Sequence, residues 1–223
     1  MALVELLGRE DSGLRAGARD RLEEYGIDVL LDDPRTPVAL LAEPDVRLSP
    51  PLIFYVLVRH ALLEGGVDDR PTADYLASMV VAFGSGNRAW RISDDAPEEF
   101  RYLVDLLLRM QEAEGRDAFL LSSHMGNFAL WLTGIFPDFL EGRRRRRGGP
   151  PVDYYQAMGT AGFRSAAATS QAEKLGVEAL LREVARSFPV LRVALNRLSD
   201  RHLWRGGGDP VERLLREVGW GRG

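Results

Sequence analysis

The sequence predicts an all-α fold, an irregular multi-helix bundle, and two observations lead to this prediction. Apolar residues recur at spacings of three and four along most of the 223 residues, which is the period of an amphipathic helix. Leucine, alanine, arginine and glutamate, which favour helices, are abundant, whereas the β-branched isoleucine is rare. We therefore expect helices throughout the chain.

Composition narrows the classes of protein further. A chain of 223 residues with 45% hydrophobic residues can bury a sizeable core, and we expect a single helical domain over residues 1–223. The net charge of -4 argues against nucleic acid as a partner. The chain has no cysteine, which excludes disulfides, iron–sulfur clusters and cysteine nucleophiles. The first ten residues lack the basic and apolar regions of a signal peptide, so the prediction is a cytoplasmic protein.

Short elements are predicted before residue 48. Apolar residues at helical spacing indicate a helix over residues 14–25, and Gly26 is a typical helix stop. The stretch 27–31 fits either a strand or a further helical turn. Pro34, Pro37 and Pro44 interrupt the next stretch, and we expect one short helix over 37–42.

The middle of the chain gives stronger signals. Ser49 and the two prolines after it favour a helix start, and the apolar run continues to glycines after Glu64. A second helix is expected over 71–83. Asp95 followed by Pro97 predicts the start of a third. The expected apolar stripe of that third helix is Phe100, Leu103, Val104, Leu107 and Met110.

Residues 118–136 include no charged side chain, and five arginines follow at 143–147. The length alone resembles a membrane span with a positive flank. Polar side chains interrupt the segment, namely Ser122, Ser123, His124, Asn127 and Thr133. We therefore predict a central core helix and no membrane partner.

The last third begins with residues that break helices. Residues 142–151 combine arginines, glycines and prolines without periodicity, which predicts a mobile loop. The segment 152–171 is predicted as a helix whose glycines and alanines let another helix approach closely. Helices are expected over 176–187 and again from Pro189 onward. A short terminal helix is expected over 211–218.

The polar cluster from Ser122 to Asn127 is the most informative part of the uncharged helix. An unpaired buried polar group costs about 1–3 kcal/mol, so these side chains need partners. On a helix, His124 shares a face with Phe128 and Trp131. Its imidazole could ligate a metal, act as a general base or contact a ligand. It could equally be a neutral core histidine bonded to a carbonyl or to a serine hydroxyl.

Two adjacent tyrosines open the 152–171 helix. We expect one ring to pack inward and the other to reach the rim of a pocket or a dimer contact. The candidate ligand-binding residues are Ser123, His124, Asn127, Trp131 and Tyr155. No catalytic residue is assigned.

A metal site would need ligands besides His124. His60 and His202 lie on two other predicted helices, and the three histidines could converge. However, neither Glu-x-x-His nor His-Glu-x-x-His occurs in the chain. The acidic pairs at 32–33 and 68–69 run into prolines and fit helix caps. We predict no metal and no cofactor.

The chain contains the segments GNFALWLTGIFP at 126–137 and DYYQAMG at 153–159. Together they resemble a pattern found in an uncharacterised bacterial all-helical family of unknown function. The resemblance implies a bacterial, soluble helical protein, and it transfers no activity and no functional residue to this chain.

The sequence supports two hypotheses about function. The first is a protein that acts by binding, through self-association as a homodimer or larger homo-oligomer, or through another protein partner. It is based on abundant apolar helix surface without a complete catalytic constellation. The second is a small-molecule-binding protein or enzyme with a polar pocket around His124. In that pocket His124 is the base or polar anchor, Ser123 and Asn127 are its hydrogen-bonding partners, and Tyr155 lies at the mouth.

Overall fold

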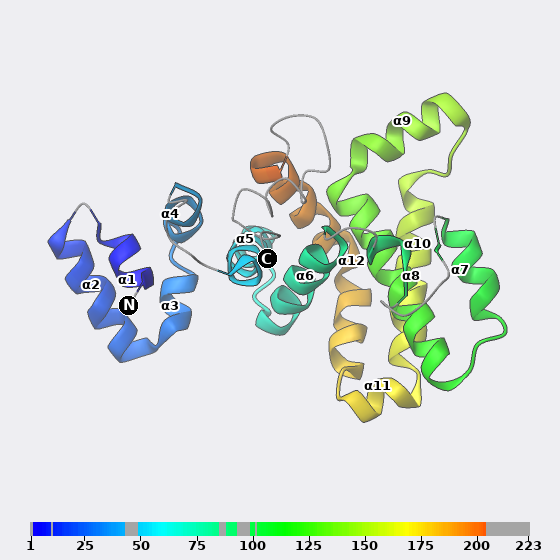
Figure 1. The fold of residues 1–223 in the computed structure, drawn as a ribbon, viewed down its shortest axis with the longest axis horizontal. Coiled ribbons are helices and arrows are strands. Elements are labelled where there is room, and N and C mark those ends of the chain that lie inside the picture. Colours follow the sequence, from blue (N-terminus) through cyan, green and yellow to red (C-terminus); the bar gives the residue numbers. More distant parts are fainter. Residues whose placement is uncertain are drawn as a thin grey trace.

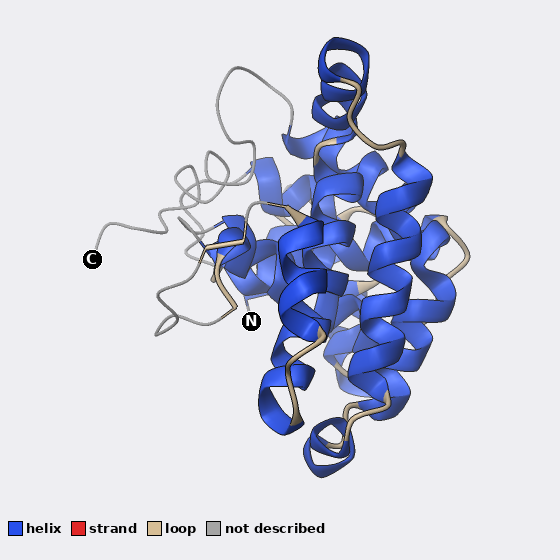
Figure 2. Ribbon diagram, turned by 90° about the vertical axis from the view of Figure 1, so that its right-hand side faces the viewer, coloured by secondary structure: helices blue, strands red, loops and turns tan. Residues whose placement is uncertain are grey.

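The computed structural model describes residues 2–9, 11–42, 49–84, 88–92, 99–100 and 102–203. It confirms the all-α prediction, since these residues form helices and no strand (Figures 1 and 2). The α-helices are α1 (Ala2–Leu7), α2 (Ser12–Tyr25), α3 (Ile27–Leu31), α4 (Thr36–Ala42), α5 (Pro50–Glu64), α6 (Arg70–Gly84), α7 (Leu103–Met110), α8 (Gly115–Ile135), α9 (Pro137–Arg147), α10 (Val152–Ala167), α11 (Ser170–Leu175) and α12 (Glu178–Leu198). A 3-10 turn, η1 (Arg88–Trp90), and a π-helical turn, η2 (Ser199–Leu203), complete them. The helix expected over 211–218 and the start expected at Asp95 lie outside the described residues.

Helix α8 lies at the centre of the bundle, packed against α7, α10 and α12 (Figure 1). The prediction of a central core helix is confirmed. From Leu121 to Ile135 every residue is buried except Ser123 and Asn127. No helix of the described chain is long and apolar enough to cross a membrane.

Glycines bring the central helices into close contact, as the sequence predicts for 152–171. A Cβ built on Gly162 of α10 would lie 2.8 Å from the Ser122 carbonyl oxygen of α8. A Cβ on Gly159 would lie 2.5 Å from the Phe188 ring of α12. On α8 itself, a Cβ on Gly126 would meet the Phe163 ring at 2.6 Å. Only residues without a side chain fit at these contacts.

Side chains of α12 and η2 donate hydrogen bonds to the carbonyl oxygens at the buried C-terminal end of α8. Asn196 donates from Nδ2 to the carbonyl oxygens of Thr133 and Gly134, at 2.8 and 2.7 Å. Ser199 donates from Oγ to the carbonyl oxygen of Ile135 at 2.9 Å. The last carbonyls of a helix have no partner within it, so these contacts allow α8 to end inside the protein.

The N-terminal helices form a smaller apolar cluster of their own. Buried residues of α1, α2, α3 and α4 pack together there, and Val56 of α5 joins them. The opposite side of α5, which includes Phe54 and Leu57, belongs to the main core. Figure 1 shows α1–α4 at one end of the longest axis and α7 and α9 at the other.

The arginine run is helical, so the prediction of a loop over 142–151 is wrong for residues 142–147. Helix α9 continues to Arg147 and ends at Gly148, whose φ of 62° is left-handed. Arginine favours helices, and cations are stabilised at the negative C-terminal end of a helix. Together these two effects outweigh the low helix propensity of the single glycine at 142. Of the residues predicted as a loop, only 148–151 lie outside a helix.

The two helices expected on either side of Pro189 are one helix, α12, with the proline inside it. Proline in a helix costs about 3 kcal/mol because a hydrogen bond is lost. The apolar stripes before and after it are in register and face the core together. The stripe is Leu181, Val184, Phe188, Leu191, Leu195 and Leu198, all of them buried. The free energy gained by burying these six side chains exceeds the free energy that the proline costs.

The glycine contacts give a stability prediction with a matched control. Gly162→Ala should destabilise the protein by about 2 kcal/mol, because the new Cβ would meet the backbone of α8, which cannot rotate away. Gly17→Ala in α2 meets nothing within 4 Å and should stabilise by about 0.5–1 kcal/mol. Urea denaturation of both variants measures this, and equal effects would contradict the close packing of α8 and α10.

Candidate functional site

His124 lies midway along α8 inside an aromatic cluster, with a residue exposure of 5%. The Phe128 ring is stacked on it at 6.1 Å between centroids, and the Phe83 ring of α6 lies 5.5 Å away. Phe83 also contacts Trp131, at 5.9 Å. The structure thus brings His124 and Trp131 onto one face of α8, as the spacing predicts.

The imidazole of His124 is neutral at physiological pH. Burial lowers its pKa to about 4, and a hydrogen bond with the backbone of Ala89 opposes this only in part. The Nε2 atom is buried and has no hydrogen-bonding partner among the described residues. A neutral imidazole can use such a nitrogen to accept a hydrogen bond.

The other predicted ligand-binding residues do not converge on His124. Asn127 accepts a hydrogen bond through Oδ1 from the Tyr75 hydroxyl of α6, at 2.7 Å. The Ser123 Oγ is buried without a partner in the described part of the chain. Tyr155 is buried on α10, with the Tyr154 ring edge-on to it at 5.6 Å.

Two cavities of the molecule lie away from the predicted residues. One of about 720 Å³ is lined by the turn between α5 and α6 and by α12, and includes Asp68, Asp69 and Glu183. Another of about 370 Å³ lies between α10 and α12 and is lined by Arg164, Ala168, Arg182 and Arg186. None of the five predicted ligand-binding residues lines either cavity.

His60 and His124 have separate surroundings. His60 of α5 contacts the carbonyl oxygen of Leu31 through Nε2 at 2.9 Å, whereas His124 faces the aromatic cluster. Within the described ranges, no three metal-binding side chains gather at one place.

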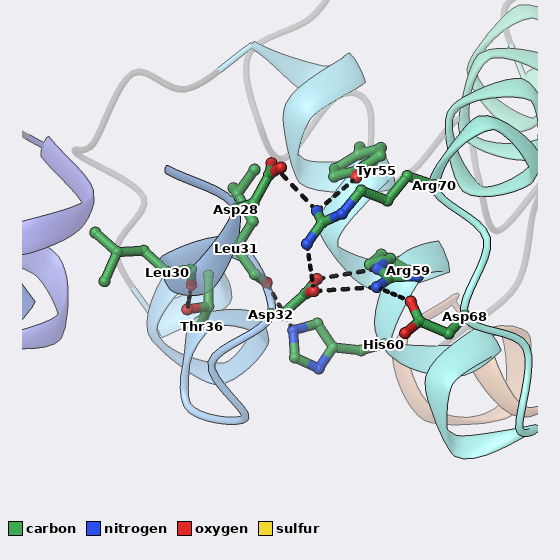
Figure 3. A network of polar contacts seen from close by, with 10 residues as sticks. All are labelled: Asp28, Leu30, Leu31, Asp32, Thr36, Tyr55, Arg59, His60, Asp68 and Arg70. Carbon is green, nitrogen blue, oxygen red and sulfur yellow. Dashed lines mark hydrogen bonds and ion pairs between the residues drawn. The ribbon is translucent and has the colours of Figure 1, made fainter. Parts of the chain in front are cut away.

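An ion-pair cluster around the buried Arg59, which the sequence did not predict, joins the N-terminal helices to the main bundle (Figure 3). We call Asp32, Arg59, Asp68 and Arg70 the Arg59 cluster. Arg59, only 1% exposed, donates from Nε and Nη2 to the two oxygens of Asp32, each at 3.0 Å. Its Nη2 also contacts Asp68, and Arg70 reaches Asp32 at 2.6 Å. The cluster therefore connects the end of α3 with α5 and α6.

The charges of this cluster stabilise one another. Burial by itself raises the pKa of Asp32, but hydrogen bonds and charge from Arg59, with the charge of Arg70, outweigh it and hold the pKa below its usual value. The same pairing raises the pKa of Arg59. The carboxylates of Asp32 and Asp68 therefore pair with arginines. The Asp69 carboxylate does cap a helix, since it accepts from the Thr72 amide at 2.9 Å.

A surface site lies on α7, where the predicted stripe is right for Phe100 and Leu103, which are buried, and wrong for two of its other residues. The buried residues of α7 are Leu103 and Leu106, and the helix is only two turns long. Val104 and Leu107, expected in the core, are exposed. We define the α7 outer face by its exposed apolar side chains, which are Tyr102, Val104, Leu107 and Leu108.

Helix α9 contacts this face through one of its arginines. The Arg143 guanidinium lies over the Tyr102 ring at 5.0 Å, a cation–π contact. Arg144, Arg146 and Arg147 are exposed on the same helix, and Arg145 pairs with Glu141 at 2.8 Å. Apolar and cationic groups thus lie side by side at one end of the molecule.

The Arg59 cluster predicts unequal costs for two similar substitutions. Asp32→Ala removes both hydrogen bonds to the nearly buried guanidinium and should destabilise the protein by about 3 kcal/mol. Asp68→Ala removes an exposed partner of the same arginine and should cost at most about 1 kcal/mol. Chemical denaturation measures both. A larger loss for Asp68→Ala would contradict the assigned role of Asp32.

His124 predicts a fall in stability with acidity. Below its ordinary pKa of 6.5 the unfolded chain binds a proton that the folded protein binds only near pH 4. Stability should therefore decrease by about 3 kcal/mol as the pH falls from about 6.5 to about 4. Denaturation between pH 4.5 and 7 tests this, and His124→Phe should remove that part of the pH dependence. The same dependence in the variant would assign it to other groups.

No protein-family model matches the chain, and no curated protein or solved structure shows significant similarity to it. The likeness of 126–137 and 153–159 to a bacterial helical family remains a prediction. The candidate sites therefore rest on the residues themselves: an enclosed histidine, an ion-pair cluster between helices, and an exposed apolar face that Arg143 of the arginine-rich α9 contacts.

Proposed function

We propose that this protein acts by binding, and that a second copy of the same chain is its partner, docked on the α7 outer face. The observation that carries the proposal is that face: Val104, Leu107 and Leu108, at positions i, i+3 and i+4, point away from the core and are exposed. Large apolar side chains grouped in this way are typical of protein interfaces.

Charge supports a second copy as the partner. Helix α9 carries five arginines against two carboxylates, whereas the whole chain has a net charge of -4. The rest of the molecule is therefore more acidic than the net charge indicates. Another copy offers carboxylates to the arginines, and such complementarity aids association and orients the partner.

The second hypothesis, a small-molecule-binding protein or enzyme, has one observation in its favour. Two buried polar atoms on consecutive residues of α8, Ser123 Oγ and His124 Nε2, have no partner among the described residues. An acceptor such as Nε2 would suit a ligand with a hydroxyl or amide donor. The described cavities lie elsewhere, so the α7 outer face remains the better supported site.

Leu108→Asp tests the proposed interface. The wild-type protein should show a mass above that of one chain in light scattering at rising concentration, and Leu108→Asp should weaken the association at least about tenfold. The control is Leu175→Asp on α11, because Leu175 is 55% exposed and Leu108 is 59% exposed. Wild-type protein that stays monomeric, or equal weakening by both substitutions, would refute the proposal.

A further inference from the structure

We propose that the surface docking on the α7 outer face is the corner between α2 and α3 of a second copy. This inference rests on the proposed function and names the second half of the interface. We define the α2–α3 corner as Glu23, Glu24, Tyr25 and Ile27.

The corner is a second place where large apolar side chains are exposed, and its charge is opposite. Tyr25 is 63% exposed and Ile27 nearly half exposed. Gly26, between them, has a φ of 80°, ends α2 and turns the chain into α3, so both side chains project from the fold. Glu23 and Glu24 precede them and are exposed, so the corner presents two carboxylates beside its apolar groups.

The α7 outer face offers the matching groups. Its apolar residues can cover Tyr25 and Ile27. Helix α9 contacts this face through Arg143 and carries the exposed Arg144, Arg146 and Arg147, which can pair with the glutamates of the corner. An arginine that holds a carboxylate through two hydrogen bonds adds geometric specificity to such a contact. The two surfaces are therefore complementary, since both have exposed apolar side chains and their charges are opposite.

The positions of the two surfaces exclude contact between them within one molecule. The N-terminal helices lie at one end of the longest axis, and α7 and α9 lie at the other (Figure 1). A corner can therefore reach an α7 outer face only on another copy. The resulting contact is heterologous, since the two copies use different surfaces.

Two variants that each disable one surface provide the test. Leu108→Asp disables the α7 outer face and keeps the corner, whereas the double variant Glu23→Arg/Glu24→Arg keeps the face and reverses the charge of the corner. Each variant alone should be monomeric at concentrations at which the wild type associates. An equimolar mixture should restore a 1:1 complex in light scattering, because one intact corner then meets one intact face.

Other outcomes separate the two proposals. If the Glu23→Arg/Glu24→Arg protein associates like the wild type, the corner is not part of the interface, whereas self-association through α7 stands. If the mixture stays monomeric, corner-to-face docking is wrong. If the wild type is monomeric and instead binds vesicles of anionic lipid or an oligonucleotide, both proposals fail and the arginines of α9 serve a different partner. Circular dichroism confirms that both variants remain folded.

Discussion

The close contact between α8 and α10 depends on backbone that carries no side chain. Gly162 lies against the α8 backbone, and Gly126 lies against the Phe163 ring of α10. This contact covers one side of α8. The aromatic side chains of α6 and α8 surround His124 on another side, since residues 124 and 126 are about 200° apart around a helix. Both sides of α8 are therefore buried, and burial keeps the imidazole of His124 neutral.

Polar groups have a different role at the margins of the core. Asn196 and Ser199 allow α8 to end in the interior by donating hydrogen bonds to its last carbonyl oxygens. Arg59 joins α3 to α5 through a pair of hydrogen bonds to Asp32. Each contact involves residues distant in sequence, so the tertiary arrangement positions them. Apolar packing supplies the bulk of the stability, and these polar contacts fix where elements end and meet.

The sequence predicts the elements whose signals are local. The prolines after Ser49 and the glycine at 26 mark helix ends where the structure has them. The glycines of α10 predict close packing because the reason is steric. The predictions from local signals are wrong where tertiary contacts determine the structure. At Pro189 the helix continues because the apolar stripe on both sides is buried. On α7 the spacing of the leucines did not show which of them face the core.

The candidate sites show the same limit. Burial of His124 could be predicted from the uncharged segment around it. Its separation from Asn127 and Tyr155 could not, because the Asn127 side chain bonds to Tyr75 and Tyr155 lies against Tyr154. The Arg59 cluster had a sequence signal in its acidic pairs, yet Arg59 itself lies in an apolar run. No pattern within one helix identifies the carboxylates that a buried arginine will meet.

Helix α5 contributes side chains to both apolar clusters, with Val56 in the N-terminal one and Phe54 and Leu57 in the main one. Helices α1–α4 thus pack against one side of α5 and shield it from solvent. A shortened chain beginning at α5 would expose that side of the helix to solvent. It would also lack Asp32, the partner of Arg59. We expect such a fragment to aggregate, because its exposed apolar surface would no longer be covered.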